Sequence, residues 1–273
     1  MARLFSGFRS ANSIRRDRPL TDDELRQVVP SVFSEDKHDS RSDRYTYIPT
    51  SHILTRLRKE GFEPFYACQQ RVRDQGRVGH AKHLLRLRRR DQILASEVSE
   101  IILLNSHDGS SSYQMIPGQF RSICSNGMVC GEVYGEIRVP HKGDIVSQVV
   151  EGAYGILDRF EAIEHSRDEM KLIRLDHREQ LAFAETALAF RYDGQHIPVT
   201  ADTVLQPRRK ADNPNDLWTV YQRTQENIIR GGLRGQTAKG AVTKTRAING
   251  IDGDIKNNRF LWSLAEKMKE LKS

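Results

Sequence analysis

The chain has 273 residues, with 43 Lys and Arg against 36 Asp and Glu, a formal net charge of +7 and a mean hydropathy of −0.62. No run approaches the roughly 18 apolar residues of a membrane-spanning helix, and no apolar stretch typical of a secretory signal follows the first residues. Three cysteines, none of them in a CxxC pair, fit neither a disulfide framework nor a four-cysteine zinc site. We therefore expect a cytoplasmic globular protein of one large or two small domains.

The charge is divided unevenly along the chain. Residues 1–90 carry a net charge of +9, residues 91–200 carry −8, and residues 201–273 carry +6. Basic ends suit a polyanion and an acidic middle suits a basic neighbour, which could be a second copy of the chain. The alternative is the ordinary unevenness of charge in soluble proteins.

The amino-terminal part of the sequence predicts an arm followed by one short helix. Residues 1–19 contain five arginines and few apolar anchors, which predicts a mobile basic arm. Thr21 and Glu24 have the spacing of a capping box, which predicts a short helix ending near Pro30. A brief strand is expected at residues 45–48.

The next segments predict a helix and an antiparallel sheet. Thr50 or Ser51 would cap a helix with apolar residues at positions 53, 54 and 57. Period-two patterns at 65–73 and 80–90, joined by a glycine-containing turn, predict a hairpin rich in arginine. An apolar strand at 98–105 would be central.

Two further features shape the predicted sheet. Residues 111–116 form another expected strand, broken by Pro117 and Gly118. Asn126 and Gly127 are expected to form a tight turn.

The pattern becomes helical after Pro140. Apolar spacing predicts helices at about 145–163, 178–190, 216–229 and 254–271, with a basic, glycine-rich loop at 230–250. The expected fold is α+β: an antiparallel sheet with a basic β-hairpin packed on helices, followed by a helical carboxyl-terminal region. The expected divisions are an arm at 1–19, a core domain at 20–200 and a helical region at 201–273.

The arginines of the hairpin form the first candidate site. Side chains two apart on one face of a strand lie about 6–7 Å apart, close to the spacing of successive phosphates. Aromatic residues nearby could stack bases. Alternatively, the arginines pair with the acidic middle, within the chain or across a subunit interface. The candidate nucleic-acid contacts are Arg71, Arg73, Arg77, Lys82, Arg86, Arg88 and Tyr66.

The glycine-rich loop is the second candidate. Arg234, Lys239 and Lys244 alternate with glycines that let a backbone approach phosphate. The loop is not a P-loop, since Ala241 stands where that motif requires lysine. The alternative is a flexible solvated loop.

A catalytic site is a less favoured interpretation than a nucleic-acid interface. His107 and Asp108 could act as base and orienter or as metal ligands, whereas Asp-Gly at a strand end is also an ordinary turn. The other histidines show no metal-ligand spacing, so we expect no metal and no cofactor. Cys124 and Cys130 could face each other across a hairpin, and a reducing compartment favours small buried thiols.

Two strings carry a family resemblance. They are IILLNSHDGSSSYQMIPGQFRSICSNGMVC at 101–130 and ENIIRGGL with TRAINGIDGDIKNNRFLWSLAEKM near the carboxyl end. They resemble the plasmid- and phage-borne family catalogued as domain of unknown function 932, which implies a mobile-element setting and no particular chemistry. The layout, though no motif, is similar to the Rad-type, Redβ and RecT single-strand annealing proteins.

Three functions are therefore expected in descending order. The first is an ATP-independent protein that binds and anneals single-stranded DNA in recombination and forms a homo-oligomeric ring or filament. The second is a metal-dependent nuclease centred on His107 and Asp108. The third is a mobile-element protein that binds an acidic host protein.

Overall fold

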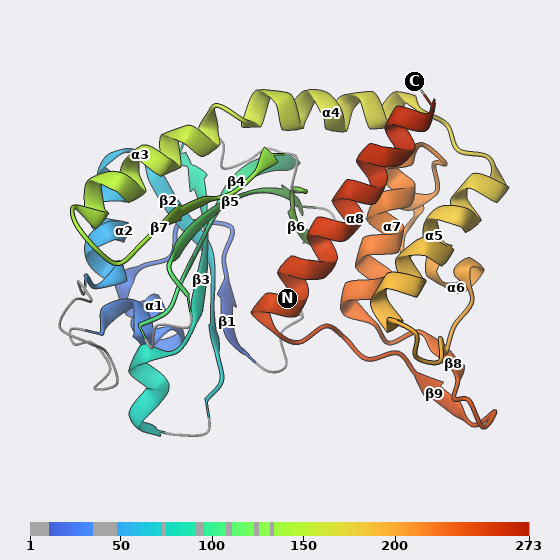
Figure 1. Cartoon of the computed structure of the whole chain (residues 1–273), viewed down its shortest axis with the longest axis horizontal. Helices are drawn as coiled ribbons and strands as arrows, with labels where there is room; N and C mark the ends of the chain where they lie inside the picture. Colours follow the sequence, from blue (N-terminus) through green and yellow to red (C-terminus); the bar gives the residue numbers. More distant parts are fainter. Residues whose placement is uncertain are drawn as a thin grey trace. The chain divides into compact units, whose positions relative to one another are not determined.

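The computed structural model divides the chain into two compact units (Figure 1). Unit 1 comprises residues 1–129 and 134–161, and unit 2 comprises 130–133 and 162–273. The α+β class is confirmed, since unit 1 holds the antiparallel sheet and unit 2 is largely helical. The structure describes residues 11–34, 48–72, 75–90, 96–107, 111–122, 126–131 and 134–272.

Unit 1 is built on one antiparallel sheet. Its strands follow chain order from β1 to β6, and β7 also pairs with β5. The predicted arginine-rich hairpin is present as β2 and β3, and the apolar strand β4 is central, as expected. The strands are β1 (Ala11–Arg15), β2 (Phe62–Gln70), β3 (His83–Arg89), β4 (Glu97–Asn105), β5 (Tyr113–Arg121), β6 (Asn126–Val129) and β7 (Ile137–Val139).

Helices of unit 1 pack on the sheet through their apolar residues. Helix α1 (Asp22–Val28) and helix α2 (Thr50–Lys59) contact β2, and helix α3 (Ile145–Leu157) contacts β4, β5 and β7. Ile53, Leu54 and Leu57 of α2 are buried, as their spacing predicts. Two short 3₁₀ helices, η1 (Pro30–Phe33) and η2 (Gln75–His80), complete the unit.

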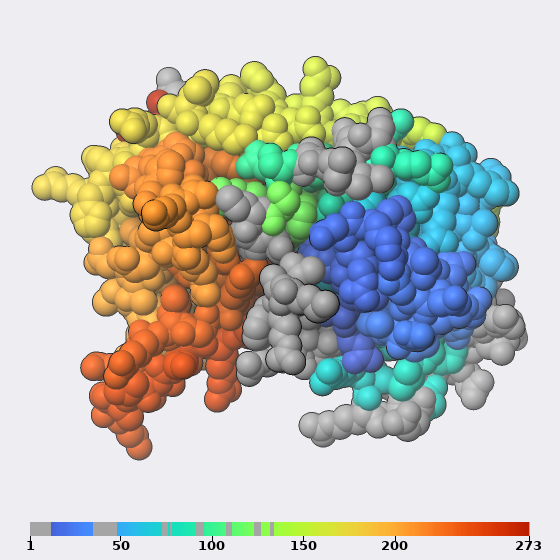
Figure 2. Space-filling model, turned by 180° about the vertical axis from the view of Figure 1, so that it is seen from behind, coloured from blue at the N-terminus to red at the C-terminus, as the bar shows by residue number. Residues whose placement is uncertain are grey.

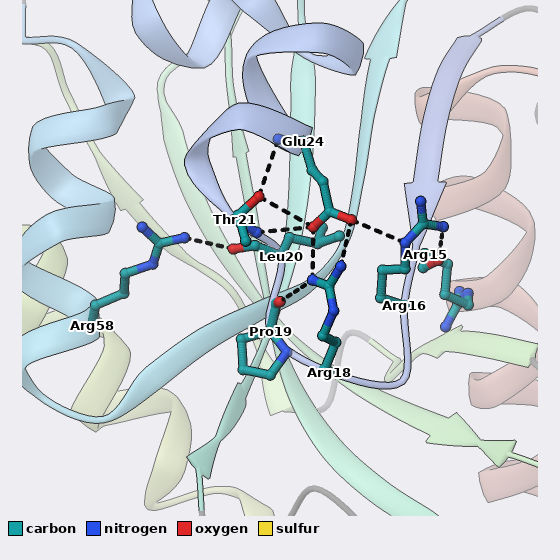
Figure 3. Close-up of polar contacts among 8 residues, drawn as sticks. All are labelled: Arg15, Arg16, Arg18, Pro19, Leu20, Thr21, Glu24 and Arg58. Atoms are coloured by element: carbon teal, nitrogen blue, oxygen red, sulfur yellow. Dashed lines mark hydrogen bonds and ion pairs between the residues drawn. The ribbon is translucent and has the colours of Figure 1, made fainter.

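Part of the expected basic arm belongs to the sheet. Residues 11–15 form β1, which pairs with β2, because Ile14 and Leu20 provide buried anchors that the arginine count obscures. Figure 3 shows Arg16 and Arg18 meeting Glu24 on α1, with Arg18 Nη2 2.8 Å from Glu24 Oε1. The Arg18 hydrogen bond, aided by the Thr21 amide, lowers the pKa of Glu24 to about 2.

Three local expectations in unit 1 are wrong. Thr50 is the first residue of α2 and does not cap it, because its hydroxyl is bound inside the core. Strand β5 continues through Pro117, which lies between the β7 pairing and the β6 pairing and so can lack an amide. Asn126 and Gly127 begin β6 and make no turn, since they pair with Arg121 and Phe120.

Unit 2 is organised around a buried helix. Helix α7 (Leu217–Arg230) packs against α5, α6 and α8, and α5 packs on α8. The rings of Trp218, Tyr221 and Trp262 meet at centroid distances of 5.4–5.9 Å. The other helices are α4 (Phe160–Leu172), α5 (His177–Tyr192), α6 (Ala201–Leu205), the 3₁₀ helix η6 (Lys210–Asp212) and α8 (Ile251–Lys272).

The helical predictions are confirmed for α5, α7 and α8, and the structure differs from expectation elsewhere. The continuous helix expected at 145–163 is interrupted at Asp158 and Arg159, where Arg159 Nη1 donates to the Tyr134 carbonyl. The compact units divide after residue 161, because α5 packs with the helices that follow it; the domain boundary expected at residue 200 stays a prediction. The expected loop at 230–250 contains a hairpin of β8 (Arg234–Gln236) and β9 (Val242–Lys244).

Candidate nucleic-acid interface

The β8–β9 hairpin presents several unpaired cations to solvent. Arg234 on β8 lies directly opposite Lys244 on β9, Lys239 lies in the connecting turn, and Arg246 follows β9. All four side chains are exposed, and none forms an ion pair with a residue that the structure describes. Figure 2 shows the hairpin projecting at the lower left beyond the helices of its own unit.

The base of this hairpin is fixed while its end projects. The Gln236 amide donates to the Pro198 carbonyl at 2.8 Å, and His196 Nε2 donates to the Gln236 carbonyl at 2.9 Å. Gly235 permits this approach, because a Cβ there would lie 2.0 Å from the Pro198 oxygen. Gly240, with φ +78°, closes the turn in the left-handed region.

Like charges opposite one another on a two-stranded ribbon repel. Arg234 and Lys244 therefore raise the energy of the bare hairpin, and an anion placed between them would relieve that repulsion. The sequence singled out these cations but did not show that two of them lie opposite each other, because register is fixed only when the hairpin forms. The alternative interpretation was a flexible loop. The antiparallel pairing of residues 234–236 with residues 242–244 argues against it.

The sheet arginines are placed differently from the prediction. Arg86 and Arg88 are buried on β3, and both ion-pair with the buried Glu100, at 3.1 and 2.7 Å. Tyr66 is also buried. Arg86 and Arg88 therefore follow the alternative expectation, in which the arginines pair with the acidic middle of the chain. We do not propose Arg86, Arg88 or Tyr66 as contacts for successive phosphates.

The other residues of the predicted site differ in exposure, and some lie outside the described residues. Arg71 is exposed and its Nε donates to Asn12 Oδ1 at 3.3 Å, while Lys82 is half-buried. Arg73 and the side chain of Arg77 lie outside the described residues. The structure therefore brings Arg234, Lys239 and Lys244 together on one hairpin and does not bring the whole predicted set together.

A buried polar network surrounds the hydroxyl of Thr50. His83 Nε2 lies 2.9 Å from Thr50 Oγ1, His107 Nε2 lies at 3.3 Å, and Asn105 Nδ2 donates to it at 3.2 Å. His83 Nδ1 lies 2.9 Å from the Ser31 hydroxyl and 3.2 Å from the Ala81 carbonyl. The His83 ring is therefore hydrogen-bonded through both of its nitrogens, to Thr50 on one side and to Ser31 and Ala81 on the other.

That pairing resembles a nucleophile beside its base, but substrate cannot reach it. Thr50 and His107 are 0% exposed and His83 is 1% exposed. Asp108, the expected partner of His107, lies outside the described residues, as does Cys124. Cys68 and Cys130 are buried. Within the described part of the chain, no group of three or more His, Cys, Asp or Glu is placed to hold a metal ion.

The network predicts acid sensitivity. Burial lowers the pKa of His83 to about 4 and that of His107 to about 2. Because an unfolded histidine takes up its proton near pH 6.5, the unfolded state gains protons first, and stability falls as pH drops from about 6.5 to 4. His83 alone should account for about 3 kcal/mol.

Urea unfolding at a series of pH values measures this effect. His83→Gln should flatten the decline between pH 6.5 and 4, whatever it costs in stability at pH 8. The exposed His52→Gln serves as the control and should leave the slope unchanged. A slope that is the same in all three proteins would contradict the assignment.

Taken together, the features define an α+β protein with a helical second unit and an exposed basic hairpin. The sequence profile of the family described as "Domain of unknown function (DUF932)" matches residues 37–262, and the chain belongs to this family. It is 62% identical to the UPF0380 protein YfjQ and 61% identical to the UPF0380 protein YafZ, both of Escherichia coli K12, over 98% of each chain. No solved structure matches it.

The comparisons agree with the resemblance seen in the sequence. The matched range includes both strings that carry it, except for the last residues of the second. None of the helices in the described ranges has the length and apolar character needed to cross a membrane.

Proposed function

We propose that this protein binds single-stranded DNA through the β8–β9 hairpin and promotes the annealing of complementary strands. The opposed pair Arg234 and Lys244, with Lys239 at the turn, is the observation that carries the proposal. Lys and Arg that contact phosphates leave the base edges available for pairing. Pairing itself drives annealing, so nucleotide hydrolysis is not required.

Anisotropy of a labelled single strand at several salt concentrations tests the binding step. The double reversal Arg234→Glu with Lys244→Glu should weaken binding at least about tenfold. Each lost phosphate contact should also reduce the slope of log affinity against log salt by about 0.7. We expect the matched duplex to bind less tightly than the single strand.

The matched control makes the same charge change in unit 1. Arg56 and Lys59 are exposed on α2, and Arg56→Glu with Lys59→Glu should bind almost as the natural protein does. Equal losses in the two double variants would mean that net charge and not the hairpin governs binding, which would overturn the proposal.

Annealing and self-association are separate steps of the proposal. Two complementary strands, one with a donor and one with an acceptor dye, should pair faster with the protein than without it, and without ATP. The reversal in the hairpin should abolish that acceleration. The alternating charge of the chain motivates a cytoplasmic homo-oligomer, and mass photometry with and without strand would detect it.

A further inference from the structure

Three arginines and one glutamate form a cluster on one face of the sheet of unit 1. Arg15 on β1 and Arg86 on β3 flank Tyr66 in register, and Arg88 lies two residues further along β3. Glu100 is the carboxylate that pairs with Arg86 and Arg88. The arginine cluster, defined as Arg15, Arg86, Arg88 and Glu100, therefore carries two positive charges in excess.

Most donors of two of these guanidiniums are unused. Arg15 makes no side-chain hydrogen bond or ion pair with a described residue, and its Nη1 atom is buried. Figure 3 shows its side chain directed away from Glu24, which Arg16 and Arg18 contact. Arg88 donates only through Nε, to Glu100 at 2.7 Å. A guanidinium has five N–H donors, so both arginines keep donors that no described residue accepts, and Arg15 Nη1 is the buried one among them.

Aromatic rings hold these guanidiniums in place. Arg15 and Arg88 both lie over Phe120, at 4.6 and 4.1 Å from the ring centroid. Arg15 also lies over Tyr66 and Arg88 over Phe65, each at 4.8 Å. Contact with a ring face fixes the plane of a guanidinium and leaves its N–H edge available.

The third guanidinium is fixed by the backbone. Arg86 Nη1 donates to Glu100 and to the Met128 carbonyl at 3.2 Å. Gly127 makes room for it, because a Cβ there would lie 2.5 Å from Arg86 Cζ. The cations are thus arranged before any ligand arrives, which reduces the entropy lost on binding.

Arg86, Arg88 and Glu100 are buried and Arg15 is half-buried. Partly removing an excess of cations from water is unfavourable unless an anion compensates. Burial lowers the pKa of Arg15 to about 10, which expresses that cost. For Glu100, burial acts to raise the pKa, but Arg88, Arg86 and Arg15 outweigh it and the pKa is lowered. Glu100 is ionised and balances one of the three guanidiniums of the cluster.

We propose that the arginine cluster binds a doubly charged oxyanion of the phosphate-monoester type. The charge of such a group equals the excess of the cluster, whereas a phosphodiester within a strand carries only one charge. Planar guanidinium edges match phosphate oxygens. The ligand would be inorganic phosphate or the terminal phosphate of a nucleic-acid strand, and the latter source rests on the proposed function.

Thermal unfolding at pH 8 tests the site with inorganic phosphate, with sodium chloride adjusted to keep ionic strength constant. The melting temperature of the natural protein should rise with phosphate concentration, because a ligand that binds only the folded state stabilises it. Arg15→Gln should remove the rise, and Arg56→Gln, on α2, should keep it. Arg15 forms no ion pair with a carboxylate among the described residues, and Glu100 keeps Arg86 and Arg88 when Arg15 is replaced.

Two results would overturn the inference. One is a natural protein that does not respond to phosphate at constant ionic strength, and the other is an Arg15→Gln protein that responds equally. The hairpin double reversal should retain the phosphate response, so failure of this inference and failure of the proposed function are distinguishable.

The two sources of phosphate are separated with labelled strands. A 5′-phosphorylated oligonucleotide should bind about tenfold tighter than its 5′-hydroxyl counterpart if the strand end is the ligand. That difference should vanish in Arg15→Gln. Equal binding of the two oligonucleotides to a phosphate-responsive protein would assign the site to the free ion.

Discussion

Replacing Glu100 by glutamine should lower the free energy of unfolding by about 3–5 kcal/mol. The substitution keeps the size of the side chain, so it creates no cavity, but it removes the one carboxylate that Arg86 and Arg88 share. Breaking a buried ion pair from one side leaves desolvated charge without compensation. Urea unfolding followed by far-ultraviolet circular dichroism measures the change.

Glu97→Gln on the same strand is the matched control. Glu97 Oε1 lies 3.9 Å from Arg121 Nε at a half-buried position, and a pair of that kind contributes at most about 1 kcal/mol. If Glu100→Gln unfolded at the same urea concentration as Glu97→Gln, Glu100 would not be balancing desolvated arginines, and the charge argument for the anion site would lose its basis.

Replacing Trp262 by alanine should destabilise unit 2 by about 3–5 kcal/mol. Its ring packs edge-on against both Trp218 and Tyr221, and its Nε1 donates to Glu266 Oε1 at 3.0 Å. The chain has two tryptophans, and both lie in unit 2. Fluorescence of the remaining Trp218 therefore reports the unfolding of this unit directly.

Trp262→Phe provides the comparison, since it retains a ring at the centre of the aromatic group and loses only part of the contact and the hydrogen bond. We expect its midpoint in urea to fall between those of the natural protein and Trp262→Ala. Equal midpoints for all three proteins would show that the aromatic group does not hold α7 and α8 together.

The strongest periodic signals predicted elements well. The β2–β3 hairpin, α5, α7 and α8 each follow from repeated apolar spacing, and α1 follows from the capping box of Thr21 and Glu24. Local signals without that support were less reliable. The Asn126–Gly127 pair favours a turn, yet Gly127 is needed inside β6 because the Arg86 guanidinium lies against it.

The predicted binding residues fall into a buried group and an exposed group, and there is a physical reason for this division. The sequence pattern predicts that Arg86 and Arg88 lie on the same face of a strand, which suggests a basic surface. The pattern does not show what covers that face or which acidic residue lies opposite. Glu100 is 12 residues from Arg88 along the chain, and only the pairing of β3 with β4 brings them together. The sequence placed Arg15 in a basic arm and gave no sign that it meets Phe120, because only the folded sheet brings the two side chains together.

The sequence by itself determined the α+β class, the main helices and strands, the family and the position of the cations at residues 234–246. These depend on periodicity, composition and contiguous motifs, which are local properties of a chain. Only the tertiary structure decided which arginines are neutralised and which remain exposed. That outcome depends on register and burial, because the energy of a charge is set by the neighbours and the solvent that folding gives it.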